Sequence, residues 1–441
     1  MQGFRKVLAC LPSVGGGNHP AEEAKPGLTD NGGIMSALRK STEFSAEERE
    51  WLTLVERKRV LVVAHTLAYG KRLVDVLSLL EADFRVQVVF TAPPHAFGDE
   101  VPRYLQGLGG VVLPWDEAVQ MNFDLALAAG PRGVEKISAP LITLPHGAGY
   151  LKRVVSGPYA GVAGLRRQDL LPGGQLPAAV VVPHHAELAD LERHCPEALP
   201  LAHVVGDPVH DRIAASLPLR AEYRQALGLS DGEKLVVVVS TWGALSSFGR
   251  IEALLPRLIT ELPAGQFRSV LLVHPNVWSG HGSWQVRSWL AGCARLGIAL
   301  VPPEADWRSV LIAADWIIGD HGSVTLYGTL TGVPILLASS PEREINLASP
   351  AAALAATAPA LSPSYPLVGQ LHYTAAEYRR DEYAAIASRI TSEPGRFNRN
   401  MRRLMYRLMG LGQPAHEPET APVPVPTPLN TWVWQRGEVR A

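Results

Sequence analysis

The stretch WRSVLIAADWIIGDHGSVTLYGTLTGVPILLAS (residues 307–339) contains the alternation that decides the fold. A helical segment leads into the apolar run DWIIGD (315–320), a second helix opens at HGS (321–323), and a further apolar run, PILLAS (334–339), follows. These runs are apolar throughout, which is typical of strands that helices cover on both faces. The stretch therefore predicts a strand–helix–strand unit of a parallel α/β fold.

The same alternation extends in both directions from this stretch. Short β-branched runs recur with helical segments between them, and the series pauses near 206–220, which begins with a Gly-Asp-Pro turn signal. We therefore expect two Rossmann-like domains facing each other across a cleft, an N-terminal domain over 45–212 and a C-terminal domain over 213–395. The expected strands are 59–65, 85–90, 123–129, 140–145 and 178–183 in the first series, and 235–240, 269–275, 297–302, 315–320 and 334–339 in the second.

The segments outside these two domains differ in composition. Residues 1–44 are punctuated by Gly and Pro without a sustained period, so we expect a tail there, and a capping box at 45–48 then predicts the first helix. Residues 396–412 predict a basic amphipathic helix, either a last helix packed across the two domains or one in peripheral contact with an anionic membrane. Residues 413–441 are Pro-rich and predict a second tail that is not needed for folding.

The composition excludes several classes of protein. Over 441 residues, 41 Lys and Arg balance 42 Asp and Glu, which argues against binding of nucleic acid through overall basicity. The three cysteines lie far apart with no CxxC, which excludes a disulfide framework and a Cys-rich zinc site. No apolar run reaches about 18 residues, so we expect no transmembrane helix. We expect a cytoplasmic protein, with peripheral contact at the inner membrane face left open by the basic helix.

Three common catalytic motifs are absent from the sequence. Without GxxxxGK[ST] the chain is not a P-loop enzyme, and without GxGxxG after the first strand hydride transfer is disfavoured. Without GxSxG it is not an α/β-hydrolase. The chemistry should therefore come from residues that follow the predicted strands, where such folds bind ligands. These residues are His65, His146, His184, His185, Ser240, Thr241, His274, Asp320 and His321.

The first candidate site is the segment 320–323 at the start of a predicted helix. Free backbone N–H groups at a helix N-terminus attract anions, Gly322 lets a ligand approach the backbone, and Ser323 supplies a hydroxyl. A diphosphate fits this pattern. In the alternative interpretation, Asp320 and Ser323 only cap the helix.

Two histidines are candidates for acid–base chemistry. His146 lies in PHGAGYLK (145–152), a turn of small residues in which a histidine can act on a hydroxyl beside the cation of Lys152. His274 lies in VHP after another predicted strand. Taken alone, each pattern is also that of a structural histidine, and VGDPVHD (205–211) is that of a plain turn between domains.

In their order along the chain, four of these segments resemble the CDP-glycerol glycerophosphotransferase family of teichoic-acid-type enzymes. The family's first motif, approximately HGTPLK, is similar to HGAGYLK (146–152), which has one extra residue before the lysine. The motif GYPRxD is similar to GDPVHD (206–211), and RxHP is similar to LVHP (272–275), which lacks the arginine. The motif aDxlIsDySSvxfd is similar to ADWIIGDHGSV (314–324), in which the tyrosine and one serine are replaced. The resemblance covers residues 140–340.

The resemblance implies a GT-B-like fold and a transferase. The implied reaction moves a glycerophosphate or glycosyl group from a nucleotide-diphospho donor, such as CDP-glycerol, to a hydroxyl acceptor, with no metal and no cofactor. In this reaction His146 is the base, and His274 stabilises charge on the phosphates. The implied donor-binding residues are Ser240, Thr241, Asp320, His321, Gly322 and Ser323, and the acceptor-side or secondary candidates are Lys152, His65 and His184.

Two alternatives stay open within the same architecture. A UDP-GlcNAc 2-epimerase-like enzyme shares GT-B and a similar diphosphate site at a helix N-terminus. A non-catalytic GT-B protein would bind a nucleotide or a partner through the same cleft, which the altered motifs and long tails favour.

Overall fold

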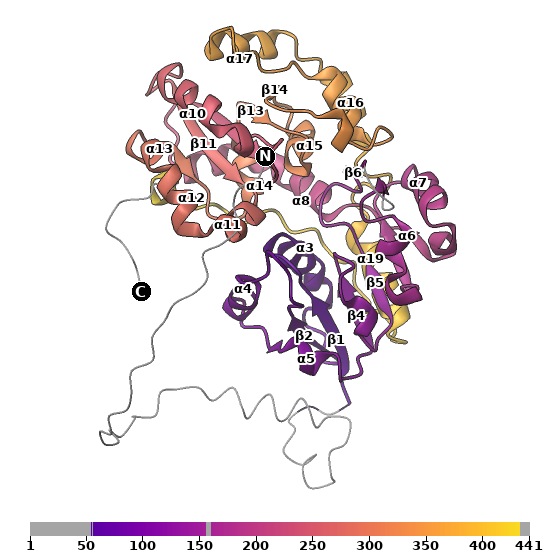
Figure 1. Ribbon diagram of the computed structural model, residues 1–441. Coiled ribbons are helices and arrows are strands. Elements are labelled where there is room, and N and C mark those ends of the chain that lie inside the picture. The colour runs from indigo at the N-terminus through magenta and orange to yellow at the C-terminus, as the bar shows by residue number, and fades with distance from the viewer. Residues whose placement is uncertain (1–53, 55, 156–159, 433–441) are drawn as a thin grey trace, which may run out of the picture. The chain divides into compact units, whose positions relative to one another are not determined.

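The structure, a computed structural model, describes residues 54, 56–155 and 160–432 (Figure 1). The predicted tail over 1–44 and the predicted capping box at 45–48 lie outside these residues. The described chain contains two parallel sheets, one in each half, and one small antiparallel pair formed by β6 (Arg153–Val154) and β7 (Gly161–Val162).

The first half forms a seven-stranded parallel sheet. The order of its first five strands in space is that of a doubly wound sheet, in which ligands bind where the winding reverses, between β1 and β4. The spatial order is β3 (Val112–Leu113), β2 (Val86–Thr91), β1 (Lys58–Val63), β4 (Leu125–Ala128), β5 (Leu141–Thr143), β8 (Ala179–Val182) and β9 (Ala202–Val204). The helices of this half are α3 (Leu67–Leu77), α4 (Val101–Gly107), α5 (Trp115–Ala118), α6 (Arg167–Leu170), α7 (Glu187–His194) and α8 (Pro208–Ser216).

The second half repeats this topology with five strands. The winding of this sheet reverses between β10 and β13. The spatial order is β12 (Ala299–Leu300), β11 (Phe267–Val273), β10 (Lys234–Ser240), β13 (Trp316–Gly319) and β14 (Ile335–Leu337). The helices are α9 (Arg220–Ala226), α10 (Ile251–Thr260), α11 (Pro275–His281), α12 (Ser283–Trp289), α13 (Ala291–Arg295), α14 (Trp307–Ala313), α15 (Ser323–Tyr327), α16 (Pro350–Thr357), α17 (Leu367–Ala376) and α18 (Arg380–Ser388).

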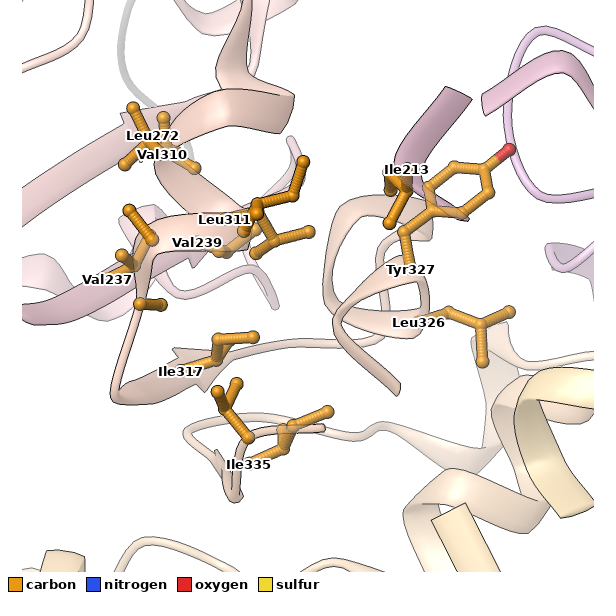
Figure 2. Close-up of a cluster of buried hydrophobic side chains, with 14 of the residues drawn as sticks. Ile213, Val237, Val239, Leu272, Val310, Leu311, Ile317, Leu326, Tyr327 and Ile335 are labelled. Carbon is orange, nitrogen blue, oxygen red and sulfur yellow. The ribbon is translucent and has the colours of Figure 1, made fainter. Parts of the chain in front are cut away.

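The central strand β10 shows why the predicted strands are apolar throughout. Val236 and Val238 belong to one apolar cluster, and Val237 and Val239 to another, so successive side chains enter cores on opposite faces of the sheet. Figure 2 shows the second of these cores, in which strand residues such as Ile317 meet helix residues. Burial on both faces leaves no polar position between Lys234 and Ser240, the two ends of the strand.

The last helix, α19 (Phe397–Leu408), packs on the core of the first half. Its apolar residues Phe397, Met401 and Met405 are fully buried there. Asp211 fixes its start, because the carboxylate accepts hydrogen bonds from the backbone N–H groups of Gly395 (2.7 Å) and Phe397 (3.1 Å). The apolar side chains of this helix therefore face protein, whereas Arg399, Arg403 and Arg407 are exposed. Within the described part of the chain, no helix combines the length and the apolar character that crossing a bilayer requires.

The Pro-rich segment differs from the predicted unpacked tail over residues 413–432. Val423 and Leu429 are buried in the core of the second half, and a short 3₁₀ helix forms at Leu429–Trp432. The backbone of Val423 is held on both sides: its N–H donates to Ser216 Oγ (2.8 Å), and its carbonyl accepts from the Tyr223 hydroxyl (2.6 Å). We refer to residues 413–432 as the strap. The two buried residues Val423 and Leu429 hold the strap on the core, although its Pro-rich composition predicts no packed structure.

Candidate active site

A cavity of about 400 Å³ lies between the loops that follow the strands of the two halves. The first half contributes helix α3 and the loops after β4 and β5, and the second half contributes the loops after β10, β11 and β13. Both sheets thus present the region where their winding reverses to one cavity. The cavity walls include the predicted residues His146, Lys152, Thr241, His274, His321, Gly322 and Ser323, and also Ser240.

His146 reaches the cavity from the loop after β5. The loop folds back on itself because the N–H of Gly149 donates to the Gly147 carbonyl (2.8 Å), with Gly149 at φ +73°. The imidazole is exposed to the cavity on one side, and its ring centroid lies 4.5 Å from that of Tyr69 on the other. Partial desolvation in the cavity lowers the pKa of His146, and the positive charges of Lys152 and Arg72 lower it further. At neutral pH the ring is neutral and able to accept a proton.

His274 faces the same cavity from the second half, at the start of α11. Its Nδ1 accepts a hydrogen bond from the N–H of Asn276 (3.1 Å), which places the proton of the neutral ring on Nε2. Desolvation lowers the pKa of His274 to about 3, with further contributions from Lys152 and His146. His274 is therefore a neutral hydrogen-bond donor at physiological pH.

Asp320 organises the loops after β10 and β13 from behind the cavity wall. Its carboxylate is 1% exposed and accepts hydrogen bonds from the N–H groups of Thr241 (2.9 Å), Ser247 (2.8 Å) and Gly322 (3.0 Å). Ser240 is also used internally, since its hydroxyl donates to the Thr241 carbonyl (2.7 Å) and accepts from Phe248 N–H (2.8 Å). Both side chains shape the loop that would contact a ligand.

His321 and Ser323 complete this side of the wall. His321 Nε2 lies 3.2 Å from a carboxylate oxygen of Glu344, and burial lowers the pKa of the imidazole, while Asp320 and Glu344 oppose that shift. Ser323 meets the His146 loop directly: a Cβ atom on Gly147 would lie 2.3 Å from Ser323 Oγ. Only glycine at position 147 allows the two loops to approach this closely.

Lys152 brings a positive charge to the cavity. Its Nζ lies 4.8 Å from the ring centroid of Trp242, a residue of the second half that also lines the cavity. Within the described chain no carboxylate oxygen lies within 4.0 Å of Nζ. Burial lowers the pKa of Lys152, and the carboxylates of Asp320 and Glu344 counteract this. The extra residue in the predicted motif thus does not keep Lys152 from the cavity.

Three predicted residues, His65, His184 and His185, lie away from the cavity wall. His65 is 1% exposed behind Tyr69, with its Nε2 2.6 Å from the Arg132 carbonyl oxygen. His184 accepts a hydrogen bond from Ala186 N–H (2.9 Å) through Nδ1, just before α7. Among the described residues, no group of three or more His, Cys, Asp or Glu side chains is arranged to hold a metal ion.

The sequence interpretation missed Tyr69, Arg72, Trp242 and Tyr327, which also line the cavity. Tyr69 and Arg72 lie on α3, which reads as an ordinary helix between two strands. Its polar residues Lys71 and Arg72 lie four and three positions before Asp75 and so share one helical face with it, which was the available signal.

Comparison with known proteins rests on structure alone. No protein-family model matches the sequence, and a search of curated proteins finds no match. The fold is similar to that of the wall teichoic acid polymerase TagF. A histidine-to-asparagine variant aligns with a TM-score of 0.54 at 13% identity, over 87% of this chain and 99% of that chain. A histidine-to-alanine variant gives 0.55 at 12% identity, over 86% and 95%. The asparagine variant soaked with CDPG gives 0.54 at 12%, over 86% and 93%. The predicted GT-B-like fold class is confirmed: the chain has the fold of the wall teichoic acid polymerase TagF.

Proposed function

We propose that the chain is a transferase that moves a glycerophosphate or glycosyl group from a nucleotide-diphospho donor, CDP-glycerol in the first instance, to a hydroxyl acceptor. The observation that carries the proposal is the meeting of two neutral histidines, His146 and His274, on the wall of one cavity. They come from different halves of the chain, and both lie in segments that resemble the glycerophosphotransferase motifs. TagF, which shares the fold, has been solved after a soak with CDPG.

In the proposed reaction His146 acts as the general base. It accepts the proton of the acceptor hydroxyl while that oxygen attacks the glycerol-bearing phosphorus. A new P–O bond forms to the acceptor, the P–O bond to the second phosphate breaks, and CMP leaves with the bonding electron pair. The acceptor is then bound by the half over 45–212, and the donor by the half over 213–395.

The donor phosphates are placed against the second half. His274 donates from Nε2 to a phosphate oxygen, and the N–H groups around Gly322 and the Ser323 hydroxyl add further donors. The arginine of the family's RxHP motif is Leu272 in this chain, so the positive charge must come from elsewhere. Lys152 supports this role, because it lines the cavity with no carboxylate partner in the described chain.

Donor binding is tested first and separately from turnover. The full chain is heated with CDP-glycerol and with UDP-, GDP- and dTDP-linked sugars at saturating concentration. A donor at a hundred times its Kd stabilises the folded state by about 2.7 kcal/mol, which a thermal-shift panel resolves. Stabilisation by none of these nucleotides would refute the donor class.

Turnover is then measured as release of the free nucleotide in the presence of a hydroxyl acceptor. Release of CMP from CDP-glycerol supports the glycerophosphate reaction, and release of UDP from a UDP-sugar supports glycosyl transfer. Binding of a donor with no release for any acceptor would favour a non-catalytic GT-B protein. Interconversion of a UDP-sugar without an acceptor would favour the epimerase-like alternative.

A further inference from the structure

Arg72 holds the loop after β5, which carries the proposed base His146, through hydrogen bonds to its backbone. It lies on α3, its side chain is 3% exposed, and its Nε donates to the Pro145 carbonyl at 3.0 Å. Its Nη2 contacts the Gly147 carbonyl at 3.4 Å. These two carbonyls flank His146 in the chain, so a single guanidinium fixes the backbone on both sides of the imidazole. A planar group with several fixed donors suits this task better than any other side chain.

Asp207 connects this grip to the second half of the molecule. One carboxylate oxygen accepts from Arg72 Nη2 (2.8 Å) and from the hydroxyl of Tyr327 (2.8 Å). The other oxygen accepts from the N–H of His210 (2.8 Å) and so caps α8. Asp207 is completely buried, so water offers its carboxylate no substitute partner.

Tyr327 ends the helix that Ser323 begins. Its ring is packed in the core of the second half, while Figure 2 shows its hydroxyl directed away from Leu326 and Ile335. The tyrosine is 1% exposed, and its hydroxyl crosses from the donor-side helix to the junction between the halves. The network therefore runs from the donor-side helix to the peptide bonds beside His146.

A buried ion pair by itself says little about stability, because apolar residues of similar volume can often replace it without loss. Its geometry is the informative feature here. We propose that Tyr327, Asp207 and Arg72 form a positioning relay that holds the His146 loop in place only when α15 is docked against α8. The proposal rests on the proposed role of His146 as the base, and it explains the GDPVHD segment, which sequence alone presents as a plain turn.

The test uses Tyr327→Phe, which removes the hydroxyl and keeps the packed ring. Hydrogen exchange of the full chain, without donor, is followed in peptides covering residues 145–152. We expect exchange there to accelerate on the order of tenfold, since the loop loses its link to the second half. Tyr383→Phe is the control, because Tyr383 is a buried tyrosine of the same core that does not line the cavity.

A second variant keeps the test decisive. Arg72→Lys retains a positive charge opposite Asp207 but cannot grip two carbonyls at once, so we expect the same acceleration in the same peptides. Where a donor has been found, both variants should lose turnover by at least the same factor while the donor Kd changes less than about twofold. Unchanged exchange over 145–152 in both variants would overturn the relay. Failure to find a donor would leave the exchange result standing, so the relay and the proposed reaction fail independently.

Discussion

At the scale of single residues, the site depends on histidines kept neutral by their surroundings. His146 and His274 have lowered pKa values for the same main reason, desolvation, and each is further affected by Lys152. Their roles differ because of their contacts. His146 has a free face toward the cavity, whereas Nδ1 of His274 is occupied by a backbone N–H.

His146→Gln should therefore separate chemistry from binding. Loss of a general base lowers turnover by roughly 10²–10⁴-fold, while the donor Kd stays within about twofold because the donor contacts lie in the second half. Nucleotide release and calorimetry measure the two quantities. His184→Gln is the matched control, since His184 lies off the cavity wall, and it should keep full turnover. Equal activity of the two variants would remove His146 from the reaction.

His65 predicts how stability depends on pH. Burial lowers its pKa from 6.5 to about 4, so between these values the unfolded chain binds more protons than the folded chain. Stability is therefore lost as the pH falls from 6.5 toward 4. When the pH is lowered from about 7.5 to about 4.5, the free energy of unfolding should fall by roughly 2–3 kcal/mol more in the parent than in the His65→Gln variant. Urea denaturation at both pH values measures this, and equal losses would contradict it.

At the scale of elements, helix α3 has two different faces. Leu67, Leu73 and Val76 are buried, Leu73 and Val76 in the core of the first half, whereas Lys71 and Asp75 bond to the second half. Lys71 Nζ donates to the carbonyl of Pro303 (3.0 Å), and Asp75 accepts from Arg308 Nη1 (2.8 Å) and Arg212 Nη1 (2.7 Å). One helix thus packs on one sheet and binds the other half through charges.

Asp75→Asn should weaken that contact. The substitution takes the carboxylate away from Arg212 and from one side of Arg308, which keeps its pair with Asp306 (2.7 Å). Loss of charged hydrogen bonds at a largely buried site should lower the free energy of unfolding by about 1.5–3 kcal/mol. Asp124→Asn is the control. Asp124 pairs with Lys58, and the two side chains are 32% and 39% exposed, respectively. Such an exposed pair should contribute less than about 1 kcal/mol to the free energy of unfolding. Chemical denaturation compares the two. A similar small loss in both would show that the α3 contact adds little.

Helices and strands also show how much of the fold and of the site could be predicted from the sequence alone. The run LVVVVS matches β10 to within one residue, because burial on both faces leaves an unbroken apolar signal. The predicted His146 and His274 each follow a parallel strand, β5 and β11, and they share one cavity because the carboxyl ends of both sheets face it. Arg72 escaped notice because Pro145 and Asp207 lie 73 and 135 positions away in the chain. Contacts at such separations leave no periodic trace in a single sequence.

At the scale of the whole molecule, the strap ties α19 to the second half. Truncation after Gly412 removes the buried Val423 and Leu429 and uncovers the surface they protect. Burial of each is worth about 1.5–3 kcal/mol, so the thermal midpoint should fall by several degrees. Truncation after Trp432 keeps the contacts of the strap described above and serves as the control. Equal thermal midpoints for the two truncations would mean that the strap does not stabilise the fold.

Within the described residues the backbone passes between the two halves three times, and each passage runs beside α8. The first passage contains Gly206, which lies against the second passage: a Cβ atom on Gly206 would lie 3.1 Å from the Glu393 carbonyl oxygen. The second is held by Asp211, and the third, the strap, by Arg212 and Ser216. Three crossings beside one helix would allow the halves to rotate about α8 and would oppose sliding or twisting. The width of the cavity mouth and the contact between Gly147 and Ser323 would then depend on a single angle, so neither could change without the other.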